Sequence, residues 1–268
     1  MDEVRRGLVL GVPAFVAACA APGMREPSLS VPPELRALLA PTGALRVGVN
    51  VGAPASMVRD RATNEARGVT FDVAAAFARS LGVPLQVVEF RTIADVLAAM
   101  KRGEVDFTGT NATPARAQDL DFSDTAMVFE LGYLVPGASR LAHADDLRRP
   151  GMRIAVVQGS TSQTTLPQLL PQAVIVPAAN LAAVTKMLGE GSVDAFATNK
   201  PTLFEVGDGV PGARVLPGSW GKELWALGIP KGRSAAVPYL NQFVRAIRAD
   251  GTLQQAVARS GLRGATLS

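Results

Sequence analysis

Two series of short apolar runs, each alternating with segments of helical spacing, constrain the fold of this chain more than any other feature. The first series predicts strands at 45–49, 85–90 and 105–108 and helices at 71–81 and 93–101. The second series predicts strands at 153–157, 174–176 and 193–197 and helices at 162–170 and 181–188. Alternation of this kind is typical of parallel sheets covered by helices, so we expect an α/β fold with two Rossmann-like units.

Two further apolar segments, 127–136 and 224–230, follow the first and the second series. Both have a strand-like composition, and two helices at 239–249 and 252–259 complete the chain. Two extended crossings between two α/β units predict two lobes joined by a two-strand hinge. We expect lobe 1 at 43–133 and 228–268, lobe 2 at 137–223, and the hinge near 134–136 and 224–227.

The N-terminal segment has the layout of an export signal. Arg5 and Arg6 precede the apolar run 7–18, and small residues lead into Cys19, the single cysteine. The run is shorter than the ~20 residues that span a bilayer. Its small-small-Cys ending resembles a bacterial lipobox, which implies a signal peptide with a lipobox at 1–19 and a lipidated Cys19; the alternatives are an ordinary signal peptide or a buried helix. Residues 20–42 begin with a segment rich in proline and small residues, and we expect them to form a flexible tether.

Composition argues against several classes of function. The formal charge is +4 and the charges are interspersed, without a basic block among aromatic residues, so we expect no nucleic-acid partner. The single histidine, His143, lies in a polar segment, and a metal site needs several converging ligands. No glycine-rich loop has the spacing of a nucleotide motif. We therefore expect neither a metal nor a cofactor.

The stretch 109–124 contains a candidate anion site. Thr113 is a favourable N-cap and the proline after it suits a first helical turn, so Arg116 is predicted in the first turn of a helix. A guanidinium beside a helix N-terminus is favourable when an anion lies between them. The residues indicate a carboxylate seat, with an exposed arginine in a surface ion pair as the alternative.

The ordered motifs of this chain resemble those of the bacterial extracytoplasmic solute-binding proteins of family 3, the polar amino acid type. The resemblance covers nearly all of 45–262. The matching pieces are GVTFDVAAAFARSLGV (68–83), LAAMKRGEVDF (97–107), TPARAQDLDFSD (113–124), QGSTSQ (158–163), GEGSVDAF (189–196), GIPKG (228–232) and IRADGTL (247–253). It implies a type II periplasmic binding protein whose two lobes close over a ligand.

The resemblance also implies site residues. Arg116 would clamp the ligand carboxylate, together with the turn formed by Gly159, Ser160 and Thr161. Ser160 and Gln163 have capping-box spacing, so a helix is predicted to begin there with its free N–H groups toward the cleft. Polar contacts to the ligand would come from the loop around Gly109, Thr110 and Asn111.

Three departures from the family pattern concern the ligand ammonium. Asn199 stands five residues after Asp194, where the family has an aspartate; Asn50 stands where some members have an acid; and 51–57 has no aromatic residue. Three alternatives follow: a ligand without an ammonium, an acid from an unidentified position, or weak amino acid binding. We favour the first. Lys200 is a second candidate for an anion contact, with a solvated surface lysine as the preferred interpretation.

The resemblance implies a non-enzymatic, monomeric receptor that delivers a small carboxylate-bearing solute, an amino acid or a related organic acid, to an ABC permease. It would act in the periplasm, with Asn199 and Asn50 as polar ligand contacts. One alternative is an enzyme like the periplasmic cyclohexadienyl dehydratases, for which the sequence shows no convincing general acid. Another is a ligand-sensing lipoprotein.

Overall fold

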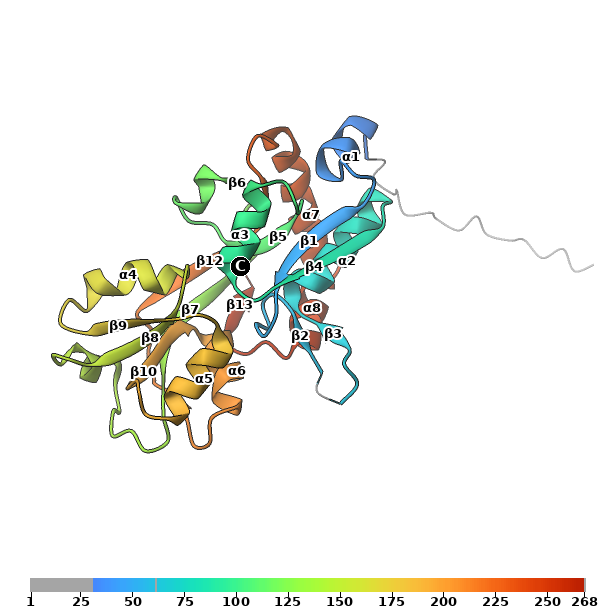
Figure 1. Cartoon of the computed structure of the whole chain (residues 1–268). Helices are drawn as coiled ribbons and strands as arrows, with labels where there is room; N and C mark the ends of the chain where they lie inside the picture. The colour runs from blue at the N-terminus through green and yellow to red at the C-terminus, as the bar shows by residue number, and fades with distance from the viewer. Residues whose placement is uncertain (1–30, 61, 268) are drawn as a thin grey trace, which may run out of the picture. The chain divides into compact units, whose positions relative to one another are not determined.

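The computed structural model describes residues 31–60 and 62–267, and the predicted α/β alternation is confirmed (Figure 1). The predicted signal peptide at 1–19, the lipidation site Cys19 and the first part of the tether, 20–30, lie outside the described residues. We use "lobe 1" for α1–α3, β1–β6, α7 and α8, and "lobe 2" for β8–β11 and α4–α6.

Lobe 1 is built on a parallel unit close to the predicted one. Its elements are β1 (Leu45–Asn50), α2 (Val69–Leu81), β4 (Leu85–Phe90), α3 (Ile93–Lys101) and β5 (Thr108–Asn111). β1 pairs with β4 in parallel, and Gly82, with φ 66°, ends α2 in the left-handed conformation that favours glycine. β5 begins three residues later than predicted because its small polar residues pair with the distant β12, which sequence periodicity does not reveal.

Lobe 2 repeats the arrangement. Its elements are β8 (Arg153–Val157), α4 (Thr161–Leu169), β9 (Val174–Ala178), α5 (Leu181–Gly189) and β10 (Ala195–Asn199), with β8 parallel to both β9 and β10. An additional helix, α6 (Lys200–Asp208), follows β10 directly. Asn199 starts it, because the side-chain Oδ1 accepts a hydrogen bond of 3.1 Å from the Thr202 N–H, and Pro201 suits the first turn.

Two long strands, β7 (Met127–Val135) and β12 (Gly221–Pro230), run antiparallel between the lobes. They lie within one nine-stranded sheet whose main path is β5-β12-β7-β10-β8-β9, with β6 paired to β12 and both β11 and β13 paired to β7. Met127 and Phe129 pack in the lobe 1 core, whereas Tyr133 and Val135 pack in the lobe 2 core. Along β7, the side chains therefore switch from packing in the lobe 1 core to packing in the lobe 2 core between Phe129 and Tyr133, before the expected hinge at 134–136.

The remaining elements correct one prediction about the tether. They are α1 (Pro33–Leu39), β2 (Val58–Arg59), β3 (Ala66–Arg67), β6 (Leu120–Phe122), β11 (Arg214–Val215), α7 (Val237–Ala249), α8 (Thr252–Ser260) and β13 (Ala265–Leu267). The second part of the predicted tether is wrong, because it contains α1. Val31 and Leu39 are buried in the lobe 1 core, so apolar burial holds this segment against the lobe.

The same arginine–aspartate clamp closes each parallel unit. In lobe 1, Arg46 at the start of β1 bonds Asp106 through Nε (2.7 Å) and Nη2 (2.9 Å), and Nη2 also donates to the Gly103 carbonyl. In lobe 2, Arg153 at the start of β8 bonds Asp194 through Nε (3.3 Å) and Nη2 (2.7 Å) and donates to the Gly191 carbonyl. The two units therefore share side-chain geometry as well as strand order.

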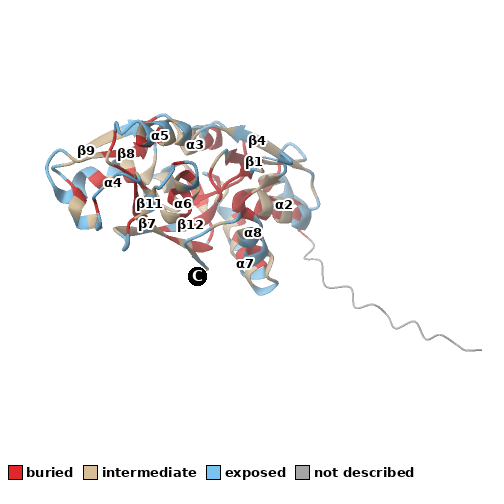
Figure 2. Cartoon of the chain, turned by 90° about the horizontal axis from the view of Figure 1, so that it is seen from below, coloured by how far each residue is buried: buried red, intermediate tan, exposed pale blue. Residues whose placement is uncertain are grey.

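Buried residues lie mainly on the inner strands and the inner helix faces of both lobes, whereas β4 has no buried residue and β9 has one (Figure 2). Helices α4, α5 and α6 contact the strands of lobe 2, and α2 and α3 contact β1 of lobe 1. Within 31–60 and 62–267, no helix combines the length and the apolar character needed to cross a membrane.

Candidate functional site

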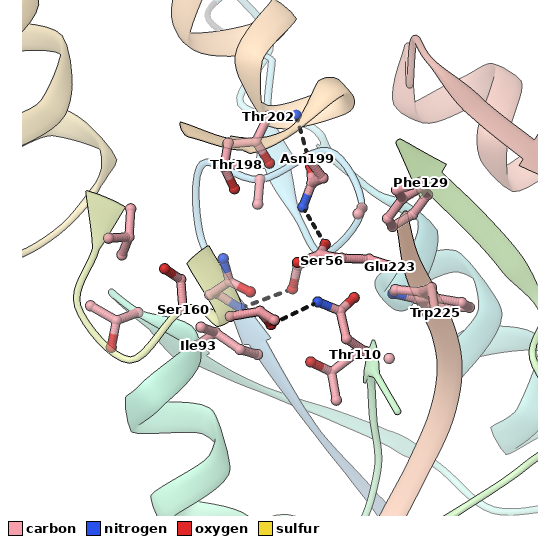
Figure 3. Close-up of a pocket in the computed structure, with 18 of the residues that line it drawn as sticks. Ser56, Ile93, Thr110, Phe129, Ser160, Thr198, Asn199, Thr202, Glu223 and Trp225 are labelled. Carbon is pink, nitrogen blue, oxygen red and sulfur yellow. Dashed lines mark hydrogen bonds between the residues drawn. The ribbon is translucent and has the colours of Figure 1, made fainter. Parts of the chain in front are cut away.

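A cavity of about 110 Å³ is lined by residues from both lobes and from β7 and β12 (Figure 3). The structure brings to it eight of the nine predicted ligand residues: Asn50, Gly109, Thr110, Asn111, Arg116, Ser160, Thr161 and Asn199. The charged and aromatic lining residues that were not predicted are Arg91, Phe129, Glu223 and Trp225. The volume is well below the roughly 300–1,000 Å³ of pockets for drug-sized ligands, so the cavity suits a small molecule.

Arg116 reaches the cavity from a single tight turn. The predicted helix is wrong, since the segment after Thr113 forms only the 3-10 turn Arg116–Gln118 before β6 begins. The predicted cap is present, because Thr113 Oγ1 accepts a hydrogen bond of 3.2 Å from the Arg116 N–H. The Arg116 side chain donates from Nη1 to Thr110 Oγ1 at 2.6 Å. Burial lowers the pKa of Arg116, and the nearby charge of Glu223 partly opposes this effect.

The N-terminus of α4 forms the facing wall. Ser160 caps the helix as predicted, because its Oγ accepts a hydrogen bond of 3.3 Å from the Gln163 N–H. The Thr161 hydroxyl accepts a hydrogen bond of 3.3 Å from Asn111 Nδ2, which links lobe 2 to lobe 1. Both Ser160 and Thr161 line the cavity.

Gly159 is the predicted site residue that the structure places elsewhere. Its N–H donates to Gln163 Oε1 at 2.7 Å, so this donor is occupied and does not face the cavity as a free N–H group. The backbone φ is 75°, and a Cβ atom at this position would lie 2.6 Å from the Ala94 Cβ of lobe 1. Gly159 is therefore a point of close approach between the lobes.

Glu223 on β12 supplies a carboxylate inside the cavity. The side chains of β12 alternate, so Glu223 and Trp225 are buried while Lys222 and Leu224 are exposed. Glu223 is 6% exposed, and its Oε2 accepts a hydrogen bond of 3.0 Å from Asn199 Nδ2. Burial raises the pKa of Glu223, whereas the Asn199 hydrogen bond and the Arg116 charge act in the opposite direction.

Asn199 therefore has two structural roles. Its Oδ1 caps α6 and its Nδ2 holds the Glu223 carboxylate. Of the three alternatives raised by Asn199, the structure agrees with an acid from an unidentified position, because Glu223 brings a carboxylate into the cavity from a different strand. The predicted strand began at Leu224 and therefore omitted Glu223. Side chains on a strand alternate between its two faces, so Glu223, two residues before Trp225, shares the buried face of that residue.

The absent aromatic residue in 51–57 is likewise replaced from the crossing strands. Phe129 of β7 and Trp225 of β12 line the cavity (Figure 3). A Cβ atom at Gly109 would lie 2.0 Å from the Trp225 ring, so the glycine makes room for the indole. Asn50, the last residue of β1, also lines the cavity, and its backbone N–H donates to Ser56 Oγ at 2.9 Å.

Two other candidates lie away from the cavity. Lys200 is not a lining residue, and its Nζ forms an ion pair with Glu130, so the preferred interpretation as a solvated lysine is wrong in detail. His143 is exposed. Among the described residues, no three histidine, cysteine, aspartate or glutamate side chains converge as a metal site.

Known proteins share both the sequence pattern and the fold. The glutamine-binding protein of Geobacillus stearothermophilus is 26% identical over 193 residues, which are 70% of this chain and 73% of that protein. The ABC transporter glutamine-binding protein of Bacillus subtilis (strain 168) is 23% identical over 244 residues, 88% of each chain.

Among solved structures, the ancestral amino acid-binding protein AncCDT-1, a precursor of cyclohexadienyl dehydratase, matches with a TM-score of 0.72 and 26% identity. The match covers 83% of this chain and 97% of that one. The fold is that of a type II periplasmic binding protein with two lobes. The sequence profile of the bacterial extracellular solute-binding proteins, family 3, matches residues 45–261, and the chain belongs to this family.

Proposed function

We propose that the protein is a non-enzymatic extracytoplasmic receptor that binds an amino acid between its lobes. One observation carries the proposal: the same small cavity holds the Arg116 guanidinium and the Glu223 carboxylate. They form no direct ion pair within 4.0 Å in the part of the chain that the structure describes. Two opposite, separated charges complement a zwitterion.

The charges suggest how the ligand would lie. Arg116 and the α4 N-terminus at Thr161 would bind the α-carboxylate, because a guanidinium and free helix N–H groups both favour an anion. Glu223, oriented by Asn199, would accept hydrogen bonds from the α-ammonium. The rings of Phe129 and Trp225 would cover the apolar part of the ligand.

This proposal replaces the expectation of a ligand without an ammonium. A buried ammonium needs a paired charge, and Glu223 supplies one where Asn199 alone offers only an amide. Relatives named as glutamine-binding proteins support an amino acid as the ligand class.

Calorimetric titration of natively purified protein with the common L-amino acids tests the proposal. At least one is expected to bind, and Arg116→Gln is expected to weaken that binding about 30-fold or more, the lower end of the effect of losing a buried charged hydrogen bond. Arg140→Gln, which removes an exposed arginine outside the cavity, is the matched control. Absence of binding by every amino acid, or wild-type affinity in Arg116→Gln, would refute the proposal.

A dehydratase activity is the second candidate, favoured by one observation. Glu223 is a buried carboxyl group with a raised pKa inside the cavity, which is the property a general acid requires. The solved structure of a cyclohexadienyl dehydratase precursor with the same fold agrees with this possibility. The wild type and Glu223→Gln are incubated with prephenate and with arogenate. Product formed by the wild type and not by Glu223→Gln would establish the enzyme. If the wild type leaves both substrates unchanged, the receptor function is the one that stands.

We further propose that the receptor acts in the periplasm as a monomer and delivers its ligand to an ABC permease, with β7 and β12 as the hinge. Ligand-dependent uptake by a reconstituted permease would support delivery, and coupling only to a sensor kinase would refute it. Gel filtration tests the monomer.

A further inference from the structure

Arg91 gives the cavity a second guanidinium. It lies in the connection between β4 and α3 and lines the cavity with an exposed side chain. Among the described residues it has no ion-pair or hydrogen-bond partner. The neighbouring acids are occupied elsewhere, because Glu89 pairs with Arg59 and Asp95 accepts a hydrogen bond of 2.7 Å from Thr92 Oγ1. The charge of Arg91 is therefore available to a ligand.

The surroundings of Arg91 also favour an anion. Thr92 caps α3, and both Thr92 and Ile93 line the cavity, so this helix presents its N-terminus there. Ser160 at the start of α4 lines the same cavity from lobe 2. Figure 3 shows Ile93 and Ser160 across the cavity from Trp225. The side away from the aromatic rings thus carries positive partial charge.

The charges lining the cavity do not balance. Arg91 and Arg116 are cations and Glu223 is the anion, which leaves one positive charge in excess. If a zwitterion occupies Arg116 and Glu223, as proposed above, the excess charge is that of Arg91. An amino acid whose side chain carries one negative charge would make the complex neutral.

We propose that Arg91 is a specificity residue that selects amino acids with an acidic side chain, of the size of aspartate or glutamate. The inference rests on the proposed amino acid receptor and adds the class of side chain to it. The ligand side chain would point from the α-carbon toward the β4–α3 connection, where the guanidinium can donate two parallel hydrogen bonds to a carboxylate.

The test compares acids with their uncharged isosteres. L-glutamate, L-aspartate, L-glutamine and L-asparagine are titrated into the wild type, Arg91→Gln, Arg91→Lys and the control Arg140→Gln. One of the two acids is expected to bind about tenfold more tightly than its amide. Arg91→Gln should abolish this preference, because it should weaken binding of the acid and change the affinity for the amide by no more than about twofold. Arg91→Lys should keep part of the ratio, because it keeps the charge but loses the planar fork.

The outcomes separate this inference from the function on which it rests. If both amides bind with equal or higher affinity than their acids, or if the ratio is unchanged in Arg91→Gln, the role of Arg91 is overturned while an amino acid receptor remains. Failure of every amino acid to bind would overturn both. Because Arg91 is exposed and unpartnered within the described residues, Arg91→Gln should melt like the wild type, so a lost ratio reports on the ligand.

Discussion

Replacing Glu223 with glutamine should separate binding from stability. The side chain is 6% exposed and its carboxylate is held by Asn199 at 3.0 Å, without a direct ion pair to Arg116 in the described structure. Burial raises the pKa of the group although hydrogen bonds from Asn199, Asn111 and Thr161 and the charge of Arg116 lower it, so the ligand-free protein compensates the buried charge only partly. Glutamine keeps the size and an acceptor oxygen but removes the charge.

Ligand affinity and ligand-free stability should respond very differently to this substitution. Loss of the partner of a buried ammonium should weaken amino acid binding by ~2–5 kcal/mol, which is about 30- to 5,000-fold. The free energy of unfolding of the ligand-free protein at pH 7 should change by about 1 kcal/mol or less, because removal of the buried carboxylate charge is offset by the loss of the nearby anion for the buried Arg116. Calorimetric titration measures the first quantity, and thermal melting without ligand measures the second.

The dependence on pH follows from the raised pKa of Glu223. The folded state binds this proton more tightly than the unfolded state, so the contribution of Glu223 to stability falls as pH rises from the unfolded pKa to the folded one. Binding of the ammonium needs the ionised carboxylate, so affinity should fall on acidification through the raised pKa. Glu223→Gln should remove this dependence.

A matched control is Glu190→Gln, which removes an exposed carboxylate of lobe 2 outside the cavity and should change neither readout. Amino acid binding by Glu223→Gln at wild-type affinity would contradict a role of Glu223 in holding the ammonium. Loss of binding together with a large drop in melting temperature would also contradict it, because Glu223 would then be a structural residue.

Three further predictions concern the fold. Asp106→Asn should destabilise the protein by ~3–5 kcal/mol, because loss of this fully buried carboxylate leaves two arginines unpaired. Asp194→Asn should cost about 1 kcal/mol or less, because its pair with Arg153 is partly exposed. Urea unfolding measures both losses of stability, and equal losses would contradict this difference. The Arg153 hydrogen bonds lower the pKa of Asp194, so Asp194 stabilises the fold fully above its unfolded pKa and loses this effect as pH falls through the lowered folded pKa. The melting temperature of Asp194→Asn should therefore depend less on pH below about pH 5 than that of the wild type. The same pH dependence in both proteins would contradict this prediction. Gly109→Ala should shift the Trp225 fluorescence spectrum and weaken ligand binding, since the new Cβ would meet the indole at 2.0 Å; an unchanged spectrum would show that the ring is not held there.

Local signals were sufficient for most of the elements. β4 (Leu85–Phe90) and α3 (Ile93–Lys101) have the predicted bounds, because apolar periodicity and the Thr92 cap act within the segment itself. α6 was missed although Asn199 and Pro201 form a helix-start signal within the segment itself. β5 was misplaced because β12 selects which residues pair.

The sequence by itself determined the family and the two α/β units, and the family resemblance implied that Arg116, Ser160 and Thr161 share one site. These features depend on contacts close along the chain and on ordered motifs. The tertiary structure alone decided where the acid comes from and what Gly159 does. Glu223 lies 24 residues beyond Asn199 in the chain. The two side chains come within hydrogen-bond distance because their strands, β12 and β10, pair with opposite edges of β7. Strand pairing between distant segments, which no local pattern encodes, therefore set the charge of the site.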